Sequence, residues 1–195
     1  MINRLDKCGD AREVPLGFLT VEALQAIMPN LSLARCHAVI RPLKDAMAEW
    51  EINTRQRAAA FLAQIAHESA EMRQFRELAS GAAYEGRSDL GNHNPGDGQK
   101  YKGRGPIQLT GRRNYRAAGA ALGLDLEGYP EHVERLSVGC RVAGWFWGTH
   151  GCNGLADMGQ FETITKRING GLTHHAARVR FYRRAREHFG LLPPE

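Results

Sequence analysis

The sequence predicts a mainly helical protein. Apolar residues recur at helical spacing in most segments, and Ser or Thr precedes several of these segments, where a side-chain oxygen can cap a helix. Strand-like alternation is almost absent. A length of 195 residues suits one domain or one domain with a small lobe, and 43% hydrophobic with 24% charged residues is typical of a soluble globular chain.

The N-terminal part predicts three helices. Thr20 caps the first, which Pro29 ends. Ser32 caps the second, and Pro42 stands in the first turn of the third, a position that suits proline. The apolar faces of the three helices comprise Val21, Leu24, Ile27 and Met28; Leu33, Cys36 and Ile40; and Leu43, Met47 and Trp50. We expect these helices, within residues 1–52, to pack on the rest of a single domain spanning 1–195.

The segment 57–77, RAAAFLAQIAHESAEMRQFRE, is the central helix and its continuation, with Asn53 or Thr54 as the cap. Glu68 follows its apolar stripe. Burying a charge is unfavourable, so a Glu there is either paired or partly protonated, and a general acid needs the second property. Glu77 lies nine positions later, beyond the expected helix end. The pair indicates a two-carboxylate hydrolase. The alternative is that Glu68 is solvated at a helix end.

Residues 86–106 contain six glycines and two prolines. Such a stretch inside a compact domain predicts a long ordered loop with a function, with a small hairpin in it. The alternative is a disordered linker between two domains. Tyr84, Leu90 and Tyr101 can anchor the ordered form.

The C-terminal half predicts four more helices. Thr110 caps the first, and Gly123 ends it. The second begins near Ser137, and the third is a shorter helix from Phe161 that ends at 169–171. Thr173 caps the last helix, which carries five arginines: Arg178, Arg180, Arg183, Arg184 and Arg186.

Cysteine and histidine spacing argues against a metal. The four cysteines form no CxxC pair, and no His-Glu-x-x-His spacing occurs. We therefore predict no metal and no cofactor. Cys140 and Cys152 could form a disulfide or remain free buried thiols.

The formal net charge of +5 indicates an acidic partner: nucleic acid, anionic membrane or anionic cell wall. The absence of a recognised nucleic-acid module disfavours the first. The N-terminal residues lack an apolar core of signal-peptide length, and no apolar run reaches membrane-spanning length. The expectation is a product that starts in the cytosol and needs another component to pass a membrane.

Three blocks, AHES at 66–69, YKGRGPIQLTGRRNY at 101–115 and RINGG at 167–171, resemble the signatures of glycoside hydrolase family 19. This family contains chitinases and many bacteriophage endolysins, and the compact form with YEGRSDLGN and PGDG is most similar to the endolysins. The resemblance implies a lysozyme-like helical fold of two lobes around a central cleft, and inverting hydrolysis of bonds between N-acetylated sugars.

The resemblance also implies residue roles. Glu68 matches the general acid, Glu77 the general base, and Thr110 the hydroxyl that holds the attacking water. Arg178 matches an arginine near the carboxylates, and the residues expected to line the sugar cleft are Gln108, Asn114, Tyr115 and Asn169.

The chain departs from the family pattern directly after Glu68. Members often have two glycines after HES, where this chain has Ala70 and Glu71. This departure affects the turn and hence the placement of Glu77. Glu85, at the mouth of the glycine-rich loop, is the rival for the role of base, and we expect Glu71 to be solvated.

The resemblance to the endolysins implies peptidoglycan as substrate, with cleavage between N-acetylmuramic acid and N-acetylglucosamine for host lysis. It further implies a monomer held in the host cytoplasm until a holin or similar partner releases it to the periplasm. The alternatives are a chitinase, and a cationic wall-binding module without catalysis. A fourth hypothesis is a nucleic-acid-binding or membrane-binding role based on the arginine-rich last helix.

Overall fold

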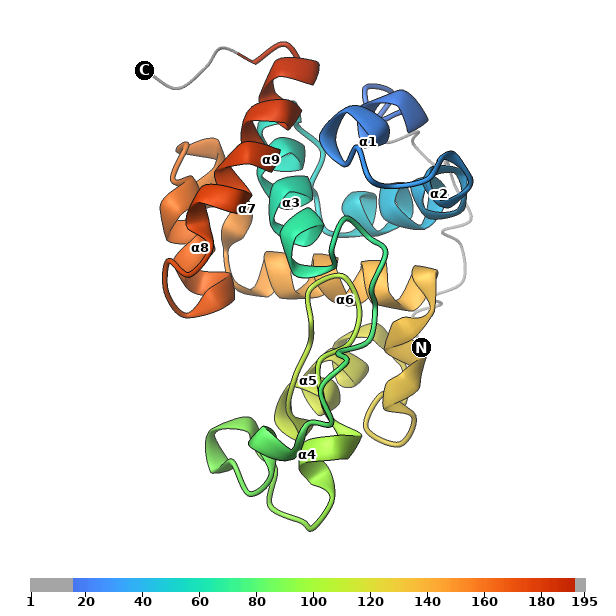
Figure 1. Cartoon of the computed structure of the whole chain (residues 1–195), viewed down its shortest axis with the longest axis vertical. Helices are drawn as coiled ribbons and strands as arrows, with labels where there is room; N and C mark the ends of the chain where they lie inside the picture. Colours follow the sequence, from blue (N-terminus) through green and yellow to red (C-terminus); the bar gives the residue numbers. More distant parts are fainter. Residues whose placement is uncertain (1–15, 192–195) are drawn as a thin grey trace, which may run out of the picture.

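The structure, a computed structural model, describes residues 16–191 (Figure 1). Its helices are α1 (Val21–Ile27), α2 (Leu33–Glu49), α3 (Arg55–Glu68), α4 (Asp97–Lys100), α5 (Arg112–Leu122), α6 (Leu136–Thr149), α7 (Cys152–Asp157), α8 (Phe161–Asn169) and α9 (His175–His188). Three short 3-10 helices span Ala82–Tyr84 (η1), Ser88–Leu90 (η2) and Pro130–Glu134 (η3). The prediction of a mainly helical fold is confirmed.

The helices form two groups (Figure 1). In the larger group, α1 and α3 pack on α9, and α7 packs on α3; the smaller group holds α4, α5 and the glycine-rich segment. Helix α6 runs between the groups and contacts both α2 and α5. Two chain segments connect the larger group to the smaller one and run next to each other. One segment contains Glu77 and the other contains Gly103, and a β-bridge between Arg76 and Arg104 joins them.

Helix α3 is the centre of the larger group. Its nine residues from Ala58 to Ala66 are all fully buried, so neighbours enclose the helix on every side. Five of the nine are alanine, and short side chains allow helix axes to come close. Because neighbouring helices enclose α3, they fix the position of its last residue, Glu68.

Helices α2 and α6 meet through Trp50 and two glycines. A Cβ added at Gly144 would lie 2.5 Å from Trp50 Cδ1, and one at Gly148 would lie 2.6 Å from Trp50 Cε3. The indole therefore occupies the space that side chains would need. Glycine in a helix interior lowers the stability of the helix, and the close contact with Trp50 explains why α6 has glycine at these two positions.

Three predicted caps are confirmed. The hydroxyls of Thr20, Ser32 and Thr54 accept hydrogen bonds from the backbone amides three residues ahead, at the starts of α1, α2 and α3. Helix α1 ends at Ile27, before Pro29, and the αL residue Gly123 ends α5, as expected. These are local signals that the sequence carries by itself.

The prediction that Pro42 starts a third helix is wrong, because Pro42 lies inside the single helix α2. The helix loses one backbone hydrogen bond there. Its buried stripe nevertheless runs in phase across the proline, from Cys36 and Val39 to Leu43 and Met47. Burial of this stripe against the core outweighs the lost bond.

Two further caps are wrong. Helix α5 begins after Gly111, and the Thr110 hydroxyl instead donates to the carbonyl of Gln108. Helix α9 begins after His174, which has a φ of +57° and makes no side-chain cap, so Thr173 lies outside the helix. Helix α7 was not predicted, because CNGLAD offers neither a cap nor a long apolar stripe.

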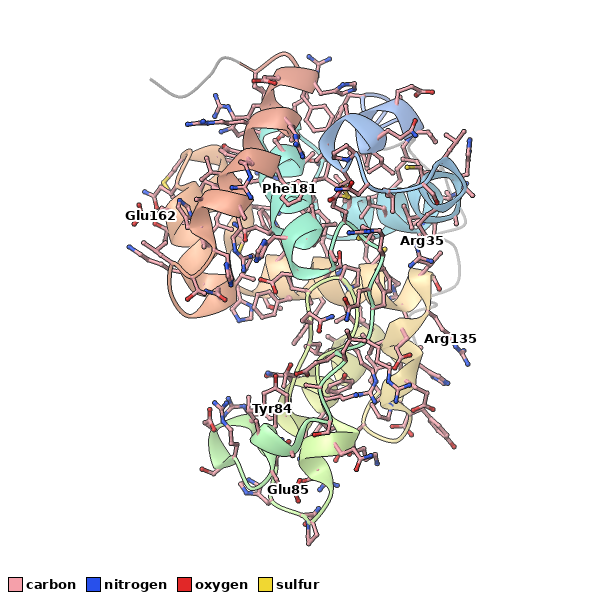
Figure 2. The ribbon with its side chains drawn as sticks, in the orientation of Figure 1. Arg35, Tyr84, Glu85, Arg135, Glu162 and Phe181 are labelled. Carbon is pink, nitrogen blue, oxygen red and sulfur yellow. The ribbon has the colours of Figure 1, made fainter. Side chains whose placement is uncertain are left out.

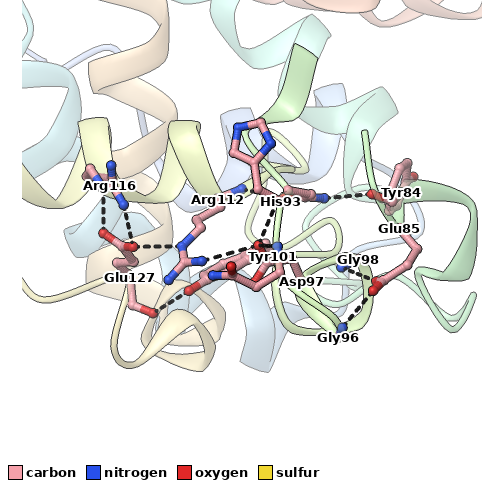
Figure 3. A network of polar contacts seen from close by, with 12 residues as sticks. Tyr84, Glu85, His93, Gly96, Asp97, Gly98, Tyr101, Arg112, Arg116 and Glu127 are labelled. Carbon is pink, nitrogen blue, oxygen red and sulfur yellow. Dashed lines mark hydrogen bonds and ion pairs between the residues drawn. The ribbon is translucent and has the colours of Figure 1, made fainter. Parts of the chain in front are cut away.

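The glycine-rich segment is ordered, which argues against a flexible linker between two domains (Figure 3). The buried Asp97 carboxylate accepts from the His93 amide and pairs with Arg112 at 3.3 Å. Glu127 accepts from Arg112 and Arg116, and these bonds lower its pKa to about 2. The expected hairpin is reduced to one bridge at the end of the segment, between Arg104 and Leu109.

The three cysteines in the described range, Cys36, Cys140 and Cys152, are free and buried. Burial raises the pKa of Cys140 to about 12 and that of Cys152 to about 11. Of the two alternatives for Cys140 and Cys152, the structure has the free thiols. Cys8 lies outside the described residues.

Candidate active site

Glu68 is the last residue of α3, and its carboxylate is anchored from α9. Arg178 Nη2 lies 2.5 Å from Glu68 Oε1, and the two side chains are 1% and 18% exposed. The arginine is therefore buried and the carboxylate reaches the surface. Glu68 is therefore not solvated at a helix end, and of the two forms expected for a buried Glu, paired or partly protonated, the structure has the ion pair.

Buried polar side chains hold Arg178 in turn. Its Nη1 donates to Gln64 Oε1 at 2.7 Å, and Gln64 Nε2 donates to the Thr165 hydroxyl at 2.9 Å. Gln64 and Thr165 are both fully buried. Because the chain of bonds joins α3, α8 and α9, the position of the Glu68 carboxylate depends on all three helices. Sequence reasoning missed Gln64; its signal was a polar residue within an apolar stripe, one turn before Glu68.

His67 lies next to this network and is neutral near pH 7. Burial, followed by the positive charge of Arg178, lowers the pKa of His67 from 6.5 to about 4. Its ring lies 5.5 Å from that of His174, between centroids. A neutral imidazole adds no second positive charge beside Arg178.

The His67 shift predicts a pH dependence of stability. The unfolded chain takes up a proton near pH 6.5 and the folded chain only near pH 4, so the unfolded state binds more protons between these values. Stability is therefore fully present above pH 6.5 and is lost as pH falls toward 4, by about 2 kcal/mol after allowance for partial exposure of the ring. Urea unfolding of His67→Gln should show a flatter profile between pH 6.5 and 4.

His37→Gln is the matched control, because His37 is exposed on α2. Its unfolding profile should follow that of the unchanged protein. An equally steep profile for His67→Gln would contradict the assignment of this window to His67.

Glu77 lies on the segment that follows α3, and both of its carboxylate oxygens are held. Oε1 accepts from the Tyr84 hydroxyl at 3.0 Å, and Oε2 accepts from the backbone amide of Gly103 at 2.9 Å. The Glu77 amide also donates to the Gly103 carbonyl. Burial and the bond to Glu77 raise the pKa of Tyr84. Each oxygen keeps a lone pair for a further donor, such as water.

Gly103 lies directly against the side chains of Glu77 and Gln108. A Cβ at Gly103 would lie 2.7 Å from Gln108 Oε1 and 3.1 Å from Glu77 Oε2. The Gln108 amide donates to the Gly105 carbonyl, and its backbone has a φ of +54°. The YKGRG block thus brings Glu77 and Gln108 into one cluster.

Glu85, the rival for the base, is held through both carboxylate oxygens, as Glu77 is. Both oxygens accept backbone amides at the start of α4, from Gly96 at 2.6 Å and from Gly98 at 2.8 Å (Figure 3). Figure 2 shows Tyr84 and Glu85 on the smaller helix group, away from Arg35 and Phe181 on the larger one. Glu77 lies on the segment that joins the two helix groups, whereas Glu85 lies within the smaller group. This position, and not the hydrogen bonding, favours Glu77 as the base, and the catalytic assignment itself stays a prediction.

The other predicted site residues divide into two sets. Thr110 and Asn114 follow Gln108, where Asn114 Nδ2 donates to the Thr110 carbonyl at 2.8 Å, and both are partly exposed. Asn169 is exposed at the end of α8, and its amide donates to the Thr173 carbonyl at 3.4 Å. Their roles toward sugar stay predictions.

Tyr115 does not fit the prediction that it borders the sugar cleft. It is fully buried, and its hydroxyl donates to the Lys102 carbonyl and accepts from Arg104 Nη1. Burial raises its pKa. Tyr115 therefore supports the YKGRG segment from beneath.

Glu71 is buried, so the expectation that it is solvated is wrong. It is 6% exposed, and its two oxygens accept from the backbone amide and the side-chain amide of Asn30, at 2.8 and 2.6 Å. The physical reason is that the turn after Glu68 faces the connection between α1 and α2. A partner 41 positions away leaves no trace in local sequence.

Basic side chains line two cavities of the smaller helix group. One, of about 350 Å³, includes Arg76, Lys100, Lys102 and Arg104 among its lining residues. The other, of about 390 Å³, is lined by His93, Arg112, Arg113 and Arg116, together with Ser88, Gly91 and Asn94. Neither cavity is lined by Glu68 or Glu77.

A two-group helical fold, with one carboxylate at the end of its central helix and a second on the following segment, is that of a lysozyme-like glycoside hydrolase. The model of the class I chitinase family matches residues 44–157, which include Glu68, Glu77 and the Gln108 cluster. The chain belongs to glycoside hydrolase family 19.

Individual proteins agree with this assignment. A glycosyl hydrolase family 19 domain-containing protein of Haemophilus influenzae is 42% identical over 108 residues, 55% of this chain and 52% of that protein. The acidic endochitinase SP2 of Beta vulgaris is 33% identical over 151 residues, 72% of this chain and 52% of that protein. The chain thus spans about half the length of these curated relatives.

Solved structures confirm the lysozyme-like fold. A bacterial family 19 chitinase superposes with a TM-score of 0.77 at 25% identity, covering 91% of this chain and 98% of that chain. Chitinase C of Streptomyces griseus gives a TM-score of 0.76 at 24% identity, covering 91% and 79%, and it supports the fold alone.

Proposed function

We propose that the protein is a peptidoglycan-degrading endolysin that hydrolyses the β-1,4 bond between N-acetylmuramic acid and N-acetylglucosamine. Glu68 protonates the leaving oxygen as general acid, and Glu77 activates water as general base. Thr110 and Gln108 hold that water near Glu77, and Arg178 orients Glu68. In the biological setting that we propose, a monomer waits in the host cytoplasm until a holin or similar partner releases it to the wall.

The observation that carries a glycosidase is the separate anchoring of two carboxylates. Arg178 holds Glu68 from α9, while Tyr84 and the Gly103 amide hold Glu77 on the segment between the helix groups. No hydrogen bond or ion pair between the two carboxylates is found within residues 16–191. Two fixed carboxyl groups with different surroundings are what acid–base cleavage of a glycosidic bond requires.

Charge favours peptidoglycan over chitin. Peptidoglycan is anionic and chitin is neutral, while this chain carries a net charge of +5 and three exposed arginines on α9: Arg180, Arg183 and Arg184. Long-range attraction therefore favours the wall polymer. A chitinase is the second candidate, since the relatives include plant endochitinases and the fold matches a bacterial family 19 chitinase.

Side-by-side digestion tests the substrate. Purified Gram-negative peptidoglycan and soluble chitin oligomers are incubated with the protein, and the products are identified by mass spectrometry. We expect muropeptides with new reducing ends from peptidoglycan at a higher rate than chitin cleavage. Cleavage of chitin alone would establish the second candidate, and binding to walls without any product would establish a non-catalytic wall-binding module.

We also predict the stereochemistry. Single displacement by a water on Glu77 inverts the β-linkage, so the α-anomer should form first. Proton NMR during the first minutes, before mutarotation, measures this ratio. Initial formation of the β-anomer would contradict the role of Glu77 as base.

Neutralising exposed arginines of α9 should weaken action on whole walls. Arg183→Gln with Arg184→Gln removes two charges, and we expect an about threefold to tenfold lower rate on walls at low salt, with little change on short neutral oligosaccharides. The difference should vanish at high salt. Rates are read as turbidity loss across a salt series.

Arg41→Gln with Arg135→Gln is the matched control, because it removes the same charge from exposed positions outside α9. It should lower the rate on walls less than the α9 pair does. Equal losses in both pairs would show that net charge, not the position of α9, governs attraction.

A further inference from the structure

The turn that follows Glu68 has an unusual backbone. Three consecutive residues, Ala70, Glu71 and Met72, have φ values of +48°, +63° and +59°, and none of them is glycine. Residues with a Cβ are strained in this left-handed region, and they visit it as single residues rather than in runs. Such a run persists only where surrounding contacts hold it.

Part of the support is local. The Ser69 hydroxyl donates to the Ile65 carbonyl and accepts from the Met72 amide, while the Glu71 amide donates to the Ala66 carbonyl at 2.6 Å. These bonds tie the turn to the last turns of α3. They leave the carboxylate of Glu71 unused.

The rest of the support comes from the N-terminal helices. The buried Glu71 carboxylate accepts two hydrogen bonds from Asn30, which lies in the connection between α1 and α2. Arg35 on α2 donates through Nε to the Met72 carbonyl at 3.1 Å. A buried carboxylate is stable only when donors satisfy it, so Asn30 is what allows Glu71 to stay in this position.

The turn lies between the two carboxylates proposed for catalysis. It begins two residues after Glu68, and five residues beyond Met72 the chain reaches Glu77, paired with Gly103. A change in the backbone of this turn therefore changes the position of Glu77 relative to Glu68. Small displacements of reacting groups lower rates strongly.

We infer that Asn30 and Glu71 are positioning residues, which hold a strained left-handed turn and so set Glu77 against Glu68. This inference rests on the proposed function for its catalytic consequence. The N-terminal helices α1 and α2 thereby take part in the active site without contacting the substrate. Arg35 acts on the same turn through the Met72 carbonyl.

Two variants that differ by a single Cβ test the inference. Glu71→Ala loses the bonds to Asn30 and keeps the strain, whereas Glu71→Gly loses the same bonds but tolerates a positive φ. The assay uses a soluble substrate that the unchanged protein cleaves. We expect Glu71→Ala to lower kcat on this substrate about tenfold, with KM nearly unchanged. Glu71→Gly should retain kcat within about threefold.

Asn30→Ala extends the test from the other partner. It removes the side-chain donor to the buried carboxylate and keeps the backbone amide of residue 30 on the other oxygen, so kcat should fall, but no further than in Glu71→Ala. Asn30→Ala combined with Glu71→Gly should recover most of the loss, because neither the carboxylate that lacks a donor on one oxygen nor the strain remains. Equal kcat in Glu71→Ala and Glu71→Gly, or no recovery in the combined variant, would overturn the inference.

Amide hydrogen exchange of residues 70–77 supplies a readout that is independent of activity. Exchange should be about tenfold faster in Glu71→Ala than in Glu71→Gly, in folded protein. If the unchanged protein cleaves no glycan, the proposed function falls, and this contrast still decides whether Asn30 and Glu71 hold the turn. Equal exchange in the two variants would show that they do not.

Discussion

Glu68→Gln should lower glycan cleavage by about 10²–10⁴-fold while the protein stays folded. Glutamine has nearly the shape of glutamate and can still accept from Arg178, so the packing at the end of α3 is kept. It cannot deliver a proton to the leaving oxygen. Reducing-end release from peptidoglycan measures the loss, and circular dichroism and urea unfolding confirm the fold.

Arg178→Lys is the companion variant. Lysine keeps the charge but lacks the planar fork that bonds Gln64 and Glu68 together, so we expect a smaller loss than in Glu68→Gln. A folded Glu68→Gln protein that clears walls at the original rate would remove Glu68 from the role of acid.

Glu77→Gln should cost nearly as much, about 10²–10³-fold in kcat, because an amide cannot take a proton from water. Its hydrogen-bonding geometry is only partly preserved. The Tyr84 hydroxyl can still donate to the amide oxygen, but the amide nitrogen cannot accept from the Gly103 amide. Initial rates on the soluble substrate, with unfolding curves for each variant, separate chemistry from stability.

Glu85→Gln is the matched comparison, and it should keep most of the activity. Its carboxylate bonds two amides at the start of α4, so we expect a loss of stability in the smaller helix group of about 1 kcal/mol. An inactive Glu85→Gln protein beside an active Glu77→Gln protein would exchange the two roles.

The sequence predicted the features that depend on neighbouring residues. The caps at Thr20, Ser32 and Thr54 and the glycine stop at Gly123 follow from side chains within one helical turn, and the structure has all four. The carboxylate Glu68 was found because it ends an apolar stripe. Its pairing with Arg178 was expected only from the family resemblance, since 110 positions separate the two residues.

The features that failed depend on distant partners. Pro42 lies inside α2 because the helix buries one continuous apolar stripe on both sides of the proline. Tyr115 is buried because its hydroxyl hydrogen-bonds to the Lys102 carbonyl and to Arg104. Glu71 was expected in solvent because its partner Asn30 lies in another turn. In each case the tertiary environment decided between local alternatives of similar energy.

The three buried thiols can be used to measure local opening of the folded protein. An alkylating reagent reacts with an accessible thiolate, and the native packing around Cys36, Cys140 and Cys152 withholds both accessibility and ionisation. These residues lie on α2, α6 and α7. With Cys8 replaced by serine, the labelling rate at each site would therefore measure how fast that helix separates from the core, without any introduced cysteine.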